Sequence, residues 1–425
     1  MNSGLLYHLN MKSVSAYFFS GNKVNHTNIG LLFVATFFAG LIFSHALQSI
    51  SMGLLVANAI INTDVKENLK KYFSDKLLMV LVLFLLTYLL SGFYSEDKSY
   101  WWERVNVRLA FVALPLGMIT LRGISQQQFM LMLRVFLWMM FMSGCVVLTK
   151  YLLHFNEVND MYSYGQTMDT PYSHVRFSLM VCFSVFTGWY LFTREKKFLF
   201  RYEKHLILIA TLFLILLLHL LAVRSGLLGF YLCAIFLLAR YIFLFRKWRE
   251  GIVALMALIL FPLMAFYYFP SVKTKVLYMK YDLEQYFLFN QVAGLSDATR
   301  IVSVKNGIEI GKENIWFGVG AGDVRDEAGK KYSGYPEIKT ASKLPHNQLV
   351  WEFASVGLIG FAVFWFASLF VFFFRRNFYD PLFVCLHLLI FSSYLTEATA
   401  DDSTGNGLYL VFLLLIYFHL KNKSE

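Results

Sequence analysis

Ionisable side chains that could do chemistry interrupt an otherwise very apolar sequence at a few places. Arg224 lies near the middle of the apolar run 205–245, and Arg300 lies early in the segment 296–314, beside an apolar stripe. His346 and Asn347 stand at the start of another apolar segment. An arginine can bind an anion with two parallel hydrogen bonds, and a histidine can exchange a proton near neutral pH. Both also have structural interpretations, because an arginine at a helix end can extend to the headgroups and a histidine there is more often structural than catalytic.

Further polar candidates lie near the ends of neighbouring apolar segments. His174 and Arg176 occur in "TPYSHVRFSL", and Glu352 lies inside the segment that follows His346. A carboxylate at lipid level is a functional candidate by default, since burying its charge is costly. An acidic cluster near the end of the chain consists of Glu397, Asp401 and Asp402. It could bind a cation, but it lacks a recognisable ligand spacing, so we expect a solvated loop.

The elements that must position these residues are membrane-spanning helices. The chain has 425 residues, of which 58% are hydrophobic and 15% charged, and this composition is typical of an integral membrane protein. A helical span needs about 20 apolar residues. About twelve such segments can be found, at 30–48, 49–62, 76–94, 104–121, 129–153, 172–193, 205–222, 226–245, 251–269, 347–374, 381–396 and 405–420. We therefore predict an all-α polytopic protein, because runs of this length satisfy their backbone groups in lipid as helices.

The distribution of Lys and Arg predicts the orientation of these spans. Basic residues gather in alternate short loops, such as 66–76 and 193–204, whereas 154–173 and 396–407 have none. This pattern predicts both termini in the cytoplasm and one integral membrane domain over residues 1–425, into which an extracytoplasmic loop, 270–345, is inserted. The net charge of +11 is then mostly a topology signal, and we expect contact with membrane lipids and no nucleic-acid partner. The apolar run 30–43 resembles the core of a signal peptide, but we expect it to remain as the first span.

The long loop carries three local patterns. Residues 271–291 predict an amphipathic helix that lies either on the membrane surface or against the spans. Ser296 is a candidate N-cap for the helix 296–314. The segment "WFGVGAGD" (316–323) has three alternating glycines, which by themselves predict a flexible turn and lack the context of a phosphate-binding loop.

Three of these stretches together resemble the O-antigen ligase and polymerase superfamily, bacterial inner-membrane glycosyltransferases that use polyprenyl-diphosphate-linked glycans. They are "AVRSG" around Arg224, "ATRIVSVKNGIEI" with the later "GVGAGD", and "HNQLVWEFASVGLIGF" from His346. The resemblance is closest over residues 220–365. It implies that Arg224 and Arg300 hold the diphosphate and that His346 is at the reacting centre, with the site facing the periplasm. Val304 stands where family members often have an aromatic residue, so the packing around Arg300 is expected to differ.

The chemistry implied by this resemblance is glycan transfer without a metal or another cofactor. Two guanidinium groups would stabilise the negative charge that grows on the departing diphosphate, and His346 would act as general base on an acceptor hydroxyl. A single displacement would invert the anomeric configuration. Arg176, His174 and Asn347 are further candidates for substrate binding.

The resemblance leaves the acceptor open. A ligase transfers the glycan to a lipid A core, and a polymerase transfers it to a second lipid-linked glycan. A third member of the superfamily transfers glycans to protein hydroxyls. The His-Asn segment favours the ligase. A polysaccharide flippase or transporter is the alternative from another class. It predicts charges spread through several spans and often internal repeats, whereas the charges here gather at the outer edge and no repeat is visible.

Overall fold

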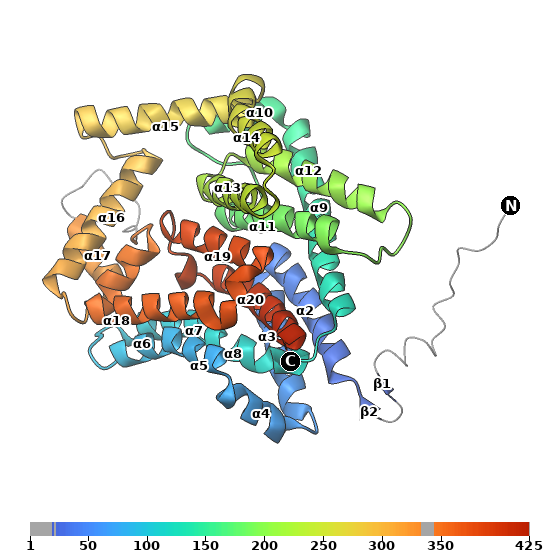
Figure 1. The fold of residues 1–425 in the computed structure, drawn as a ribbon. Helices are drawn as coiled ribbons and strands as arrows, with labels where there is room; N and C mark the ends of the chain where they lie inside the picture. Colours follow the sequence, from blue (N-terminus) through green and yellow to red (C-terminus); the bar gives the residue numbers. More distant parts are fainter. Residues whose placement is uncertain (1–18, 21–22, 333–343, 425) are drawn as a thin grey trace.

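The chain forms a bundle of apolar α-helices in a computed structural model that describes residues 19–20, 23–332 and 344–424 (Figure 1). By length and composition, nine helices in this part of the chain can cross a membrane. The predicted all-α polytopic membrane fold is therefore confirmed. A short antiparallel pair, β1 (Phe19–Ser20) and β2 (Lys23–Val24), precedes the bundle. Residues 1–18 and 21–22, and residues 333–343 of the predicted loop, lie outside the described residues.

Nine of the twelve predicted spans correspond to helical segments that are long and apolar enough to cross. These are α2 (His26–Phe43), the run of α7 (Lys98–Arg108), α8 (Ala110–Gly117) and η1 (Met118–Leu121), then α9 (Gln126–Leu153), α11 (His174–Arg194), α12 (Glu203–Leu221), α13 (Arg224–Phe245), α14 (Trp248–Tyr268), α18 (Gln348–Phe373) and α20 (Ser403–Ser424).

The other three predicted spans are helical but shorter or bent. The helix α3 (His45–Ile61) turns by 112° into α4 (Val65–Ser74), and the segment 76–94 forms α5 (Lys76–Leu81) and α6 (Leu83–Ser91). The helix α19 (Pro381–Tyr394) has 14 residues, and the Asp380 carboxylate caps its start by accepting from the N–H groups of Leu382 and Phe383. After α19, the 3₁₀ turn η3 (Thr399–Asp401) leads into α20.

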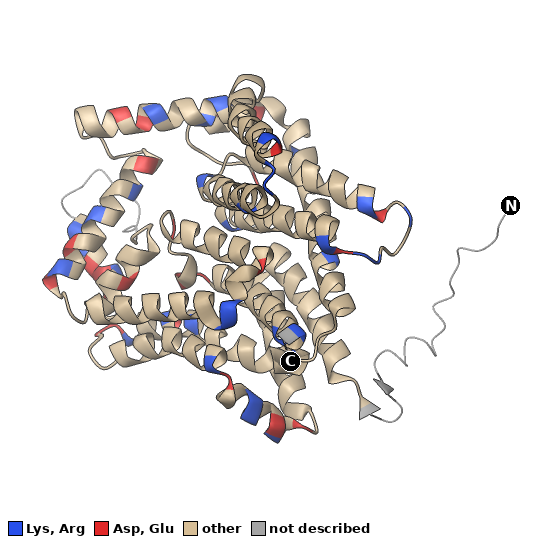
Figure 2. Cartoon of the chain, in the orientation of Figure 1, with Lys and Arg blue, Asp and Glu red and all other residues tan. Residues whose placement is uncertain are grey.

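The helices of the bundle differ strongly in burial. Most of the apolar window of α11 and of α20 is covered by other helices, whereas most of the window of α13 and of α14 faces outward. The helices α11 and α20 therefore form the centre of the bundle, and the apolar surfaces of α13 and α14 are those that lipid would cover. Figure 2 shows that Lys, Arg, Asp and Glu concentrate in loops and on α4, α15, α16 and α17.

The long loop is largely helical in its described part, as predicted. It contains α15 (Pro270–Phe289), α16 (Ser296–Glu313) and α17 (Val324–Tyr332), and α16 packs against α18 (Figure 1). The prediction that Ser296 is the N-cap of α16 is wrong. The carboxylate of Asp282, buried on α15, accepts hydrogen bonds from the N–H groups of Asp297 and Ala298 at 2.8 and 3.0 Å. This contact fixes α16 relative to α15.

The glycine-rich turn 316–323 is docked on α18 rather than free, which corrects the expected flexible turn. At Gly357 the helix α18 is interrupted, with φ 65° and ψ −167°. The N–H of Val319 donates to the carbonyl of Ala354, and the N–H of Leu358 donates to the carbonyl of Ile315. The break in α18 therefore exposes backbone groups that the loop satisfies, and this holds the end of α16 against the membrane helices.

Replacing Gly357 with alanine is expected to lower the melting temperature of the purified protein in detergent. Its backbone conformation is nearly exclusive to glycine and costs about 1–3 kcal/mol for other residues, and an added Cβ would lie 2.4 Å from the N atom of Phe317. Gly53→Ala is the matched control, because nothing lies within 4 Å of a Cβ at that helical position. Equal melting temperatures for Gly357→Ala and the unmodified protein would show that the docked turn is not needed for stability.

Candidate functional site

Arg224 lies at the junction of α12 and α13, between the predicted spans 205–222 and 226–245. The chain reverses at Ala222, which has a left-handed conformation with φ 49°, and α13 begins at Arg224. The Arg224 guanidinium makes two parallel hydrogen bonds to the carboxylate of Asp297, with Nη2 2.5 Å from Oδ2. Because Asp297 is in the first turn of α16, this bidentate pair joins the membrane bundle to the loop helices.

Arg300 is one turn further along α16 and faces a residue that lies far away in the sequence. Its Nη2 atom is 3.1 Å from Oε1 of Glu397, in the loop between α19 and η3. The other oxygen of Glu397 is 3.2 Å from Nδ1 of His346. Glu397 therefore connects two of the residues that the sequence singled out.

Glu397 is charged in this setting and determines which ring nitrogen of His346 is protonated. Burial opposes ionisation of Glu397, but the hydrogen bond from His346 and the charge of Arg300 outweigh it and lower the pKa of this carboxyl group. A carboxylate only accepts hydrogen bonds, so Nδ1 of His346 carries the hydrogen. In a neutral imidazole, Nε2 is then left with a free lone pair that can accept a proton.

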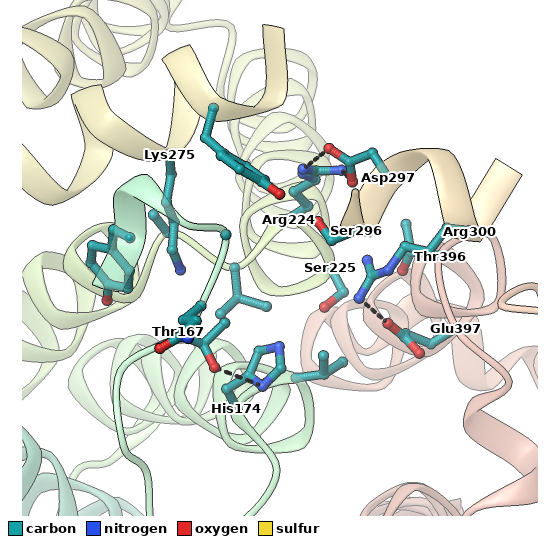
Figure 3. A pocket seen from close by; sticks show the side chains of 17 residues that line it. Thr167, His174, Arg224, Ser225, Lys275, Ser296, Asp297, Arg300, Thr396 and Glu397 are labelled. Atoms are coloured by element: carbon teal, nitrogen blue, oxygen red, sulfur yellow. Dashed lines mark hydrogen bonds and ion pairs between the residues drawn. The ribbon is translucent and has the colours of Figure 1, made fainter. Parts of the chain in front are cut away.

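Arg224 and Arg300 line one cavity of about 280 Å³ (Figure 3). The cavity lies between the ends of α11, α12 and α13 and the helices α15 and α16, and Glu397 closes one side. His174, at the start of α11, also lines this cavity, and its Nδ1 atom lies 3.4 Å from Oγ1 of Thr167. We refer to this space as the arginine cavity.

A second cavity of about 390 Å³ begins at Glu397 and is lined by His346 and Arg176. Nε of Arg176 is 2.5 Å from Oδ2 of Asp402, and its Nη1 donates to Oγ1 of Thr399 at 3.2 Å. The backbone N–H of His346 donates to Oγ of Ser303 on α16 at 3.2 Å. We refer to this space as the histidine cavity. Since Glu397 lines both cavities, they meet at the Arg300–Glu397–His346 chain.

Asn347, like Glu352, is a sequence candidate that lines neither of these two cavities. Its side-chain oxygen accepts from the N–H groups of Leu349 and Val350 and so caps α18. Its amide nitrogen donates to the carbonyl of Leu395 at 3.1 Å. Asn347 therefore fixes the start of α18 next to His346, which is a positioning contribution.

The expected solvated acidic loop is wrong. Glu397 and Asp401 are each only 9% exposed. Oδ2 of Asp401 lies 2.9 Å from Nη2 of Arg108, and the same guanidinium pairs with Glu352. Each carboxylate of the cluster thus has a cationic partner, because the loop folds inward between the ends of the helices.

Arg108, Lys275 and Glu397 were not predicted as site residues. Arg108 is fully buried within a predicted span, and a charge inside a span was a signal that could have identified it. Lys275 lines the arginine cavity, where its Nζ donates to the carbonyl of Leu221 at 2.8 Å and lies 4.2 Å from the ring centre of Tyr162. Glu397 was noted only as part of the acidic cluster expected to be solvated, and Lys275 gave no local signal, because it faces the site only through the tertiary fold.

Residues 207–365 match a protein-family model described as O-antigen ligase. The predicted resemblance to the O-antigen ligase superfamily is confirmed. The O-antigen ligase region runs from α12 into α18 and contains Arg224, Lys275, Arg300 and His346. No curated protein matches the chain. The O-antigen ligase family indicates a multi-pass membrane glycosyltransferase of the ligase or polymerase type that acts on lipid-linked glycans.

Proposed function

We propose that this protein is an O-antigen ligase of the bacterial inner membrane. It transfers a glycan from a polyprenyl-diphosphate carrier to a sugar hydroxyl of a lipid A core, at a site that faces the periplasm, with both chain termini in the cytoplasm. The observation that carries the proposal is the convergence of Arg224, Arg300 and His346, from three separate segments, around two cavities that meet at Glu397. The family match supports the same class of reaction.

In this proposal the arginine cavity receives the diphosphate of the donor. Arg224 and Arg300 are each held by a carboxylate, Asp297 and Glu397, which fixes the guanidinium groups before a ligand binds. A guanidinium has five N–H donors, so donors remain for phosphate oxygens after these contacts. When the bond between the anomeric carbon and the phosphate oxygen breaks, its electron pair goes to the diphosphate. Fixed cations beside that oxygen stabilise the growing charge without having to reorganise.

The histidine cavity is then the place for the acceptor. His346 takes the proton of the acceptor hydroxyl on Nε2 while the hydroxyl oxygen bonds to the anomeric carbon. The nearby Glu397 carboxylate stabilises the imidazolium that forms. In this proposal the acceptor occupies the histidine cavity and the diphosphate the arginine cavity, and the oxygen attacks from the side opposite the leaving group. This predicts transfer with inversion, through a single displacement and without a metal ion.

An apolar cavity of about 480 Å³ offers room for part of the polyprenyl chain. It is lined by residues from α9, α12, the end of α14 and the start of α15, including Leu216, Leu220 and Pro270. Leu220 lies two residues before Ala222 of the arginine cavity. The tail of a lipid diphosphate can therefore leave the arginine cavity between these helices and reach an apolar surface.

The purified protein is expected to transfer a labelled glycan from polyprenyl diphosphate to one class of acceptor in buffer that contains EDTA. Parallel reactions offer a lipid A core, a second lipid-linked glycan and a protein with exposed hydroxyls. Label on the lipid A core supports the ligase. Label on a lengthened lipid-linked glycan would show that the protein is a polymerase instead, and label on protein would show that it transfers glycans to protein hydroxyls. Absence of transfer in all three reactions would contradict the proposed function.

A further inference from the structure

We propose that Lys275 is a third cation for the donor diphosphate and that it binds the diphosphate only in its protonated form. This inference rests on the proposed function. It adds a pH-controlled component to the arginine cavity.

Lys275 is placed to reach a ligand that the two arginines hold. It comes from α15 and lies across the arginine cavity from Arg224 and Arg300 (Figure 3). Its ammonium group donates one hydrogen bond, to the carbonyl of Leu221. An ammonium has three N–H donors, so two remain for phosphate oxygens.

The charge balance of the cavity gives Lys275 a role that the arginines do not fill. Arg224 is neutralised by Asp297 and Arg300 by Glu397. Among the described residues, no carboxylate forms an ion pair with Lys275. The cavity lining therefore has three cations and two carboxylates, a net charge of +1 with the histidine neutral, and the unbalanced charge is that of Lys275. The released diphosphate is more negative than the diester from which it forms, so this unbalanced cation favours the products of transfer.

The surroundings of Lys275 make its charge sensitive to pH. Burial, together with the charge of Arg224, lowers the pKa of Lys275 to about 7. A bound diphosphate raises this pKa, because it favours the charged ammonium. The contribution of Lys275 to affinity is then complete below about pH 7 and is lost as the pH rises through the pKa of the complex. The other titratable and charged groups that line the cavity come from each neighbouring element: Tyr162 of α10, His174 of α11, Arg224 of α13, Tyr278 of α15, Asp297 and Arg300 of α16, and Glu397 of the loop after α19.

The experiment measures binding of farnesyl diphosphate to the purified full-length protein in nanodiscs between pH 6 and pH 9. The unmodified protein is compared with Lys275→Arg, which stays charged, and Lys275→Met, which cannot be charged. At pH 6 we expect Lys275→Met to bind about 10- to 100-fold more weakly than the unmodified protein. Between pH 6 and pH 9 the unmodified protein should lose affinity by a similar factor relative to Lys275→Arg. The farnesyl diphosphate itself titrates in this range, but it does so equally for both proteins, so their ratio reports on Lys275.

Two results would overturn the role of Lys275. The first is equal affinity of Lys275→Met and the unmodified protein at pH 6. The second is an identical pH profile for the unmodified protein and Lys275→Arg, and this comparison remains decisive if Lys275→Met fails to fold. Arg300→Ala separates this inference from the proposed function. If Arg300→Ala loses binding while Lys275→Met does not, only the role of Lys275 fails; if the unmodified protein neither binds the diphosphate nor transfers glycan, the proposed function fails.

Discussion

Replacing His346 with alanine is expected to lower kcat for glycan transfer by about 10²–10⁴-fold, the usual contribution of a general base. Nδ1 of His346 is held at 3.2 Å from Glu397, which leaves Nε2 to take the proton of the acceptor hydroxyl. Without the imidazole, the hydroxyl must attack while it still carries its proton. The binding of the donor should change little, because the proposed diphosphate site, the arginine cavity, is lined by other residues.

The matched control for this variant is His154→Ala. The His154 side chain is 61% exposed and pairs with Glu157 near the end of α9, away from both cavities. Its replacement should leave transfer unchanged. The backbone hydrogen bond from His346 to Ser303 does not depend on the side chain, so His346→Ala should also keep its melting temperature. Full transfer activity in His346→Ala would remove the general base from the proposed reaction.

Replacing Arg300 with alanine is expected to lower kcat by about 10²–10³-fold and also to weaken donor binding. In the proposed reaction Arg300 provides a fixed guanidinium beside the departing diphosphate, and its loss leaves Glu397 without its arginine partner. The negative charge of Glu397 would then repel the diphosphate instead of being neutralised. Arg300→Lys keeps the charge but not the planar fork of donors, so its activity should lie between those of Arg300→Ala and the unmodified protein.

Arg201→Ala serves as the control, because Arg201 is exposed in the loop between α11 and α12 and lines neither cavity. Binding of farnesyl diphosphate separates the two active-site variants. It should be weakened in Arg300→Ala and retained in His346→Ala, since the proposal assigns Arg300 to the leaving group and His346 to the nucleophile. Unweakened binding and transfer in Arg300→Ala would show that the arginine cavity does not hold the donor.

The sequence predicts those parts of the fold that depend on local composition. Long apolar runs predict the helices, and the predicted spans 205–222 and 226–245 meet where α12 and α13 are joined. The bend of 112° between α3 and α4 could not be obtained in this way, because composition does not give the angle at which two helices meet. Composition shows which segments are apolar, but not where each helix ends.

The site could be predicted only where a motif or a charge at lipid level marked a residue. Arg224, Arg300 and His346 were found through their positions and their resemblance to a family. Their contacts could not be found, because the sequence does not show that Asp297, Glu397 and Lys275 face these residues in the folded chain. Glu397 in particular lies 51 residues from His346, and only the packing of α19 next to α18 brings the two together.

The most direct test of the account is the structure of the protein in nanodiscs with a polyprenyl diphosphate bound. The account predicts phosphate oxygens within hydrogen-bonding distance of Arg224 and Arg300 in the arginine cavity, with the prenyl chain leaving toward Leu216 and Leu220. It also predicts that His346 lies on the far side of Glu397 from the diphosphate, facing free space for an acceptor. A diphosphate bound elsewhere in the bundle, with the arginine cavity empty, would contradict it.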